Sequence, residues 1–93
     1  MKIPKKLKVG GVVYNVNITD KLTLGHQFSG EILRSDRVIN IRPIMGKEET
    51  FIHEMVHAIL YMGGYIDHDE QMVEAISQGL WAVITDNKEM FKE

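Results

Sequence analysis

Hydrophobic and polar residues alternate in the first half of the chain at the two-residue period of a β-strand. In the stretch "LKVGGVVYNVNI", residues 7–18, Tyr14, Val16 and Ile18 fall on one side of a strand, and two asparagines fall on the other. A Gly-Gly pair offers a turn between two short arms. The pattern therefore predicts a first β-hairpin.

A second hairpin is predicted in the stretch "FSGEILRSDRVINIR". Its arms are Gly30–Leu33 and Arg37–Arg42, and the pair Ser35 and Asp36 favours a turn between them. Pro43 ends the strand pattern, because proline cannot donate a backbone hydrogen bond to a sheet.

The period changes to that of a helix from Lys47 to Met62. A Gly-Gly pair ends this helix, since glycine is favoured just past a helix C-terminus. A second helix is predicted from about Glu70 to Thr85, with Asp67 or Asp69 capping its first turn. The order predicts an α+β domain in which N-terminal antiparallel β-hairpins are followed by two helices packed on one sheet.

The composition narrows the class of protein. The 93 residues suit one domain spanning 1–93, and 44% of them are hydrophobic, which is enough for a small core. Without cysteine, the chain can form neither disulfides nor cysteine-ligated zinc sites. A net charge of −2 gives no electrostatic case for nucleic acid. No stretch has the pattern of a signal peptide or a membrane span, so a cytoplasmic protein is expected.

The first predicted helix carries "HEMVH", in which His53 and His57 are four residues apart and Glu54 follows the first histidine. Residues at this spacing point the same way, so both imidazoles can bind one metal ion, and zinc suits imidazole nitrogen. Glu54 is turned by about 100° from His53. It lies beside such an ion, where it can accept a proton from zinc-activated water. Two histidine ligands and a glutamate base at this spacing form the HExxH motif.

The competing interpretation is a pair of core histidines with ordinary hydrogen-bond partners. The motif lies in a helix that is apolar on nearly all sides, so it should be buried. Buried polar groups without partners are costly, and a metal site gives two histidines and a glutamate a reason to share the core. The surroundings therefore favour a zinc site.

A catalytic zinc site needs a third protein ligand, and the candidates lie downstream. If the two helices form an antiparallel hairpin, residues at equal distances from the loop face each other. This count pairs His57 with Glu74, which we predict as the third ligand. Glu70, one turn nearer the loop, and His68, within the loop, remain alternatives.

The stretch "HEMVHAIL" followed by "VEAISQG" resembles the gluzincin arrangement, in which HExxH lies on one helix and a zinc-binding glutamate on the next. With its lysine-rich start, "KVGG" and a hairpin ending in "INI", most of the chain resembles small phage and prophage zincin-like metallopeptidases near the ImmA/IrrE group. The resemblance implies His53, His57 and Glu74 as zinc ligands and Glu54 as the base. It also implies an edge strand, one arm of the second hairpin, that lies beside the metal helix and pairs with an extended peptide.

Two related groups of proteins suggest other residues as the third ligand. Members of the ImmA/IrrE group often place their glutamate a turn earlier, which matches Glu70. The motif is also similar to that of SprT-like proteases, whose third ligand is a histidine, and His68 is the residue available for that role.

These observations predict a zinc metallopeptidase that acts on a peptide or protein substrate, with neither nucleic acid nor membrane as a partner. Glu54 would be the general base. The alternative is a non-catalytic zinc-binding protein that uses a zincin scaffold as a protein-interaction module, since a short chain leaves little room for a substrate cleft. Glu54 favours the enzyme, because a structural zinc site needs no base. Candidate donors to an oxyanion are Tyr61, Tyr65, His68 and His26.

Overall fold

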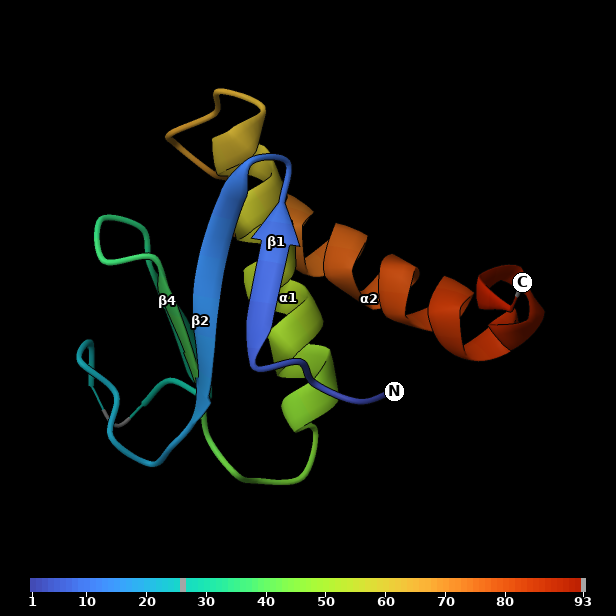
Figure 1. The fold of residues 1–93 in the computed structure, drawn as a ribbon, viewed down its shortest axis with the longest axis horizontal. Helices are drawn as coiled ribbons and strands as arrows, with labels where there is room; N and C mark the ends of the chain where they lie inside the picture. Colours follow the sequence, from blue (N-terminus) through green and yellow to red (C-terminus); the bar gives the residue numbers. More distant parts are fainter. Residues whose placement is uncertain (26, 93) are drawn as a thin grey trace.

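The computed structural model describes residues 1–25 and 27–92 of the chain. A four-stranded sheet is followed by two long helices, so the predicted α+β class is confirmed (Figure 1). The strands are β1 (Lys6–Val9), β2 (Val12–Ile18), β3 (Gly30–Leu33) and β4 (Val38–Ile41). The helices are α1 (Lys47–Met62), α2 (Glu70–Asp86) and the short 3₁₀ helix η1 (Lys88–Phe91). Within the described residues, no helix combines the length and apolar character needed to cross a membrane.

The sheet has the strand order β1-β2-β4-β3. Both predicted antiparallel hairpins are present, as β1 with β2 and β3 with β4. A parallel pairing of β2 with β4 joins them, with Val16 opposite Ile39. The sheet is therefore mixed, whereas the hairpin patterns alone predict antiparallel pairing. The arrangement leaves β3 as one edge of the sheet.

The hydrophobic core lies between α1 and one face of the sheet (Figure 1). Ile39 and Ile41 of β4 and Ile52 of α1 are almost completely buried. Burying such a side chain contributes roughly 1.5–3 kcal/mol, so the alternation in β4 and the apolar stripe of α1 decide which faces meet. The other buried members of this cluster are Val9, Tyr14, Val16, Phe51 and Ala58.

The end of α1 is set by a glycine turn. The N–H of Gly64 donates to the carbonyl of Tyr61 at 3.0 Å, and that of Tyr65 donates to the carbonyl of Leu60 at 2.9 Å. Gly64 has a φ of 95°, a left-handed conformation that glycine adopts without strain. The chain therefore reverses directly after Met62, as the Gly-Gly pair predicts.

Helix α2 begins at Glu70 because Asp69 caps its first turn. The Asp69 carboxylate accepts hydrogen bonds from two backbone N–H groups at 2.9 and 3.2 Å, so Asp69 rather than Asp67 is the cap. Beyond its first turns, α2 diverges from α1 and extends away from the sheet (Figure 1). Within α2, Val73 and Ser77 are the buried residues. Further along α2, Leu80, Trp81 and Ile84 are partly buried and pack against the hydrophobic core.

A buried carboxylate fixes the connection between β2 and β3. Glu31 is 2% exposed and accepts hydrogen bonds from the Asn40 amide at 2.8 Å and from the N–H groups of Thr23 and Leu24 at 2.9 and 2.8 Å. Burial raises the pKa of a carboxyl group, but these hydrogen bonds outweigh it and lower the pKa of Glu31 below its usual value. The ionised side chain thus holds Leu24 beside the edge strand β3.

Candidate metal centre

Helix α1 presents the residues of the HExxH motif beside the edge strand of the sheet. His53, Glu54 and His57 line one pocket together with Gly30 of β3. Glu54 and His57 are buried, and His53 is partly exposed. The centroids of the two imidazole rings lie 5.1 Å apart. The four-residue spacing therefore brings both histidines to one site.

The carboxylate of Glu70, the first residue of α2, reaches both histidines. Its Oε1 lies 3.2 Å from Nε2 of His57, and its Oε2 lies 3.5 Å from Nε2 of His53. A tetrahedral ion bound at 2.0–2.1 Å places its ligand atoms about 3.3 Å apart. The three side chains therefore lie close enough together to hold a metal ion. Across residues 1–25 and 27–92, this is the group of histidine and acidic side chains close enough together to hold one.

Glu74, the predicted third ligand, lies on the other side of His53. Its Oε2 is 2.9 Å from Nδ1 of His53, and its Oε1 accepts a hydrogen bond from the Gln78 amide at 2.7 Å. His57 thus faces Glu70, one turn nearer the loop than the count from the loop indicates. That count assumes parallel helices, whereas α2 diverges from α1 (Figure 1). Glu74 as a ligand stays a prediction, and the geometry favours Glu70.

A chain of hydrogen bonds fixes the proton on His57. Nε2 of His68 lies 2.8 Å from the carbonyl oxygen of Tyr65, which can only accept, so this nitrogen carries the proton. In a neutral His68, Nδ1 is then an acceptor, and it lies 2.7 Å from Nδ1 of His57. His57 therefore donates its Nδ1–H and leaves Nε2 to face Glu70. Burial lowers the pKa of His57, which favours the neutral imidazole that a metal requires.

Glu74 orients His53 in the same way. A carboxylate only accepts hydrogen bonds, so the 2.9 Å contact makes Nδ1 of His53 the protonated nitrogen. Nε2 of His53 is then available on the side of Glu70. A carboxylate partner of this kind is usual for a metal-binding histidine. The sequence identifies Glu74 and His68 as neighbours of the histidines, but it gives no sign that each touches the nitrogen facing away from the site.

The carboxyl group of Glu54 has an unusual environment. Burial, followed by repulsion from the carboxylates of Glu70 and Glu31, raises the pKa of Glu54 to about 8. A positive ion held by the adjacent histidines would lower this pKa again. A carboxyl group that titrates near neutral pH is suited to both accepting and returning a proton.

The outer edge of β3 runs along the same pocket, which Gly30 and Ile32 line. The N–H of Arg42 donates to the carbonyl of Ser29 at 2.9 Å. Alternation along the antiparallel pair then directs the N–H and C=O groups of Gly30 and Ile32 away from β4 and toward the open edge. A Cβ at position 30 would lie 2.6 Å from Cγ2 of Thr50, so glycine permits the close approach of β3 to α1.

The predicted oxyanion donors are placed differently. The ring of Tyr61 packs 4.4 Å from that of His68 and lines the pocket of the histidines. Tyr65 is 65% exposed, and its backbone carbonyl contacts His68. His26 lies outside the described residues. Tyr61 is therefore the tyrosine at the pocket.

Comparison of the chain with protein-family models, curated proteins and solved structures finds no match. The resemblance to zincin-like metallopeptidases of phages near the ImmA/IrrE group therefore stays a prediction.

Proposed function

We propose that the chain is a small zincin-like metallopeptidase in which His53, His57 and Glu70 bind zinc and Glu54 is the general base. The convergence of three ligand atoms beside a buried carboxyl group is the observation that carries this proposal. Two imidazole nitrogens and a carboxylate form a ligand set that is usual for catalytic zinc. Zinc, when bound, lowers the pKa of water and polarises a carbonyl group.

Glu54 would move the proton in this reaction. It takes a proton from the attacking water and returns it to the leaving amine. Its position next to His53, with its carboxyl group in the same pocket, supports this role.

The substrate would be an extended peptide. The outward N–H and C=O groups of Gly30 and Ile32 can pair with it as an added strand, which is a common mode of peptide recognition. Such a peptide would run past Glu54, because Gly30 and Glu54 line one pocket.

The test compares wild type with Glu54→Gln, both purified without chelator and loaded with zinc. Each is assayed for metal content and for cleavage of a diverse peptide mixture, with products identified by mass spectrometry. We expect about one zinc per chain in both proteins and a loss of cleavage of about 100-fold or more in Glu54→Gln. Equal cleavage by both proteins would refute the role of Glu54. Zinc binding with no cleavage by wild type would favour the non-catalytic interaction module instead.

A further inference from the structure

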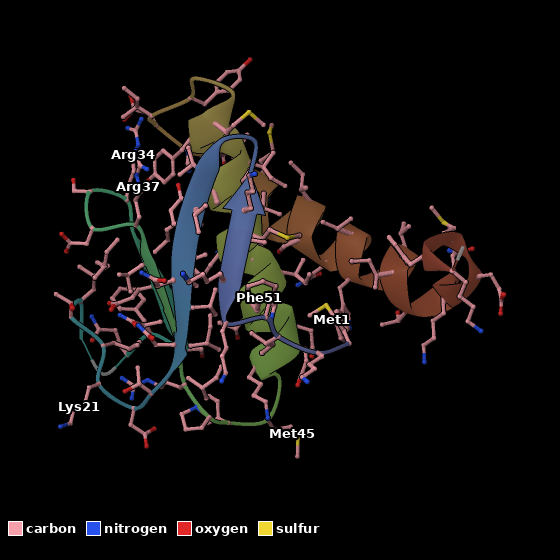
Figure 2. All side chains as sticks on the ribbon, in the orientation of Figure 1. Met1, Lys21, Arg34, Arg37, Met45 and Phe51 are labelled. Carbon is pink, nitrogen blue, oxygen red and sulfur yellow. The ribbon has the colours of Figure 1, made fainter. Side chains whose placement is uncertain are left out.

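A second pocket lies at the loop that joins β3 to β4. Arg34 and Arg37 line it, together with Val12, Tyr14, Ser35, Tyr61 and Met62. Tyr61 also lines the pocket of the candidate metal centre, so the two pockets adjoin across one tyrosine ring. Figure 2 shows both arginines together at this loop, far from Lys21 at the opposite end of the sheet.

These two arginines differ from Arg42, the third arginine of the chain. Arg42 uses its guanidinium to bind the carbonyl oxygens of Phe28, Asp20 and Gly25 at 2.6, 2.8 and 3.2 Å. Among the described residues, neither Arg34 nor Arg37 has a side-chain hydrogen bond or an ion pair. The guanidinium of Arg34 instead lies 4.7 Å from the centroid of the Tyr61 ring. Both charged groups are therefore available to a ligand from solvent.

The backbone of Arg37 is strained in a way that fixes its position. Its φ is 55°, a left-handed conformation that glycine adopts readily and other residues rarely do. The N–H of Arg37 donates to the carbonyl of Arg34 at 3.2 Å, and its carbonyl accepts from the N–H of Asn15 at 2.9 Å. A large cationic residue held at such a position points to a use for its side chain.

We propose that Arg34 and Arg37 form a subsite for a carboxylate of an extended peptide that lies along β3. This inference rests on the proposed function, since it uses the same strand edge. Arg34 follows Ile32 by two residues and begins the turn directly after β3, which ends at Leu33. A peptide paired with Gly30 and Ile32 therefore brings a nearby side chain or its own C-terminus to the arginines. Arginine binds carboxylates through two parallel hydrogen bonds, which gives it geometric as well as electrostatic selectivity.

The test uses zinc-loaded Glu54→Gln protein and dye-labelled ten-residue peptides built from Ala, Ser and Thr. One arm of the experiment places a single Glu at successive positions in peptides with blocked ends, each matched to a Gln peptide. The other arm compares free with amidated C-termini and so separates the two sources of a carboxylate. Fluorescence anisotropy at low ionic strength measures affinity. We expect the best Glu peptide, or the free C-terminus, to bind about five- to tenfold more tightly than its neutral match.

The measured quantity is the affinity for the charged peptide divided by the affinity for its neutral match. The variants Arg34→Gln and Arg37→Gly should each reduce this ratio about two- to threefold, and together they should bring it close to one. Arg37→Gly suits the left-handed backbone, so it should fold normally. Lys21→Gln removes a cation remote from the pocket and should leave the ratio unchanged. Equal affinity ratios in the Glu54→Gln protein with and without the two arginine substitutions, or no binding by any peptide, would overturn the subsite. A charge preference without cleavage by wild type would overturn only the peptidase activity, and cleavage without the preference would overturn only the subsite.

Discussion

The Nδ1 atoms of His57 and His68 lie 2.7 Å apart, and the other ring nitrogen of His68 is bonded to a backbone carbonyl. This pair links the loop between the helices to the face of His57 that points away from Glu70. The loop therefore does more than reverse the chain, because it selects which nitrogen of His57 is available to a metal ion.

Removing this partner should weaken metal binding without unfolding the protein. We expect His68→Ala to lower zinc affinity about 10–100-fold, because His57 loses the acceptor that orients its ring. Competition against a zinc-binding dye measures the change, and thermal denaturation of the zinc-free protein checks the fold. Asp67→Ala, in the same loop, should leave the affinity unchanged. A His68→Ala variant with wild-type affinity would show that the hydrogen bond has no part in orienting His57.

The two downstream glutamates should respond differently to removal of their charge. Glu70→Gln should release zinc, because the amide is a poor replacement for the carboxylate that faces both Nε2 atoms. Glu74→Gln should retain zinc with affinity reduced about tenfold or more, since it orients His53 from the opposite side. Metal analysis after dialysis distinguishes them. Loss of zinc from Glu74→Gln, with retention in Glu70→Gln, would restore Glu74 as the ligand.

The zinc-free protein should become less stable as the pH rises between about 4.5 and 8. The pKa of Glu54 is about 8 in the folded chain against 4.5 for an ordinary glutamate. Over this window the unfolded chain has lost a proton that the folded protein keeps, so stability falls with rising pH by up to about 1.4 kcal/mol per unit. Glu54→Gln should remove this slope, whereas Glu49→Gln, at an exposed position of α1, should retain it. Urea denaturation at several pH values measures the free energy of unfolding. If it changes with pH equally in wild type and Glu54→Gln, then Glu54 is not the source of the slope.

Much of the fold follows from local patterns in the sequence. The strand pairs of both hairpins, the span of α1 and the glycine turn after Met62 each depend on neighbouring residues, and the structure has them where the patterns predict. The parallel pairing of β2 with β4 depends on the path of the long connection between β2 and β3, which has no periodic pattern. Glu31 holds that connection through three hydrogen bonds, and a single glutamate within a strand gives no signal of such a role.

In the candidate site, too, some features follow from local patterns and others depend on how the elements are arranged. HExxH places His53, Glu54 and His57 from helical geometry alone, and these residues lie together in one pocket. Whether Glu70 or Glu74 faces both histidines depends on the angle between the helices. Counting residues from the loop assumes that this angle is zero. Because α2 diverges from α1 after its first turns, the nearer glutamate reaches both histidines.

The close approach of β3 to α1 should depend on the absence of a side chain at position 30. Gly30→Ala would press a methyl group against Cγ2 of Thr50, and we expect a loss of about 1–3 kcal/mol in the free energy of unfolding. Thr50→Ser removes that methyl group but keeps the hydroxyl that bonds to the carbonyl of Gly46. The double variant should therefore recover part of the loss, as a double-mutant cycle from urea denaturation can show. Strict additivity of the two changes would contradict the predicted contact.

Helix α2 has only two buried residues, and its Leu80, Trp81 and Ile84 pack against the core while staying partly exposed. Near the connecting loop, Glu70 and Glu74 contact His53 and His57. An ion bound there would tie the two helices together across a short loop, as a disulfide cross-links many other small domains. This chain has no cysteine and a thin core. Chelation would then leave the apolar contacts of α2 as its attachment to the rest of the domain. A bound metal ion would thus serve both as a reagent and as a structural cross-link.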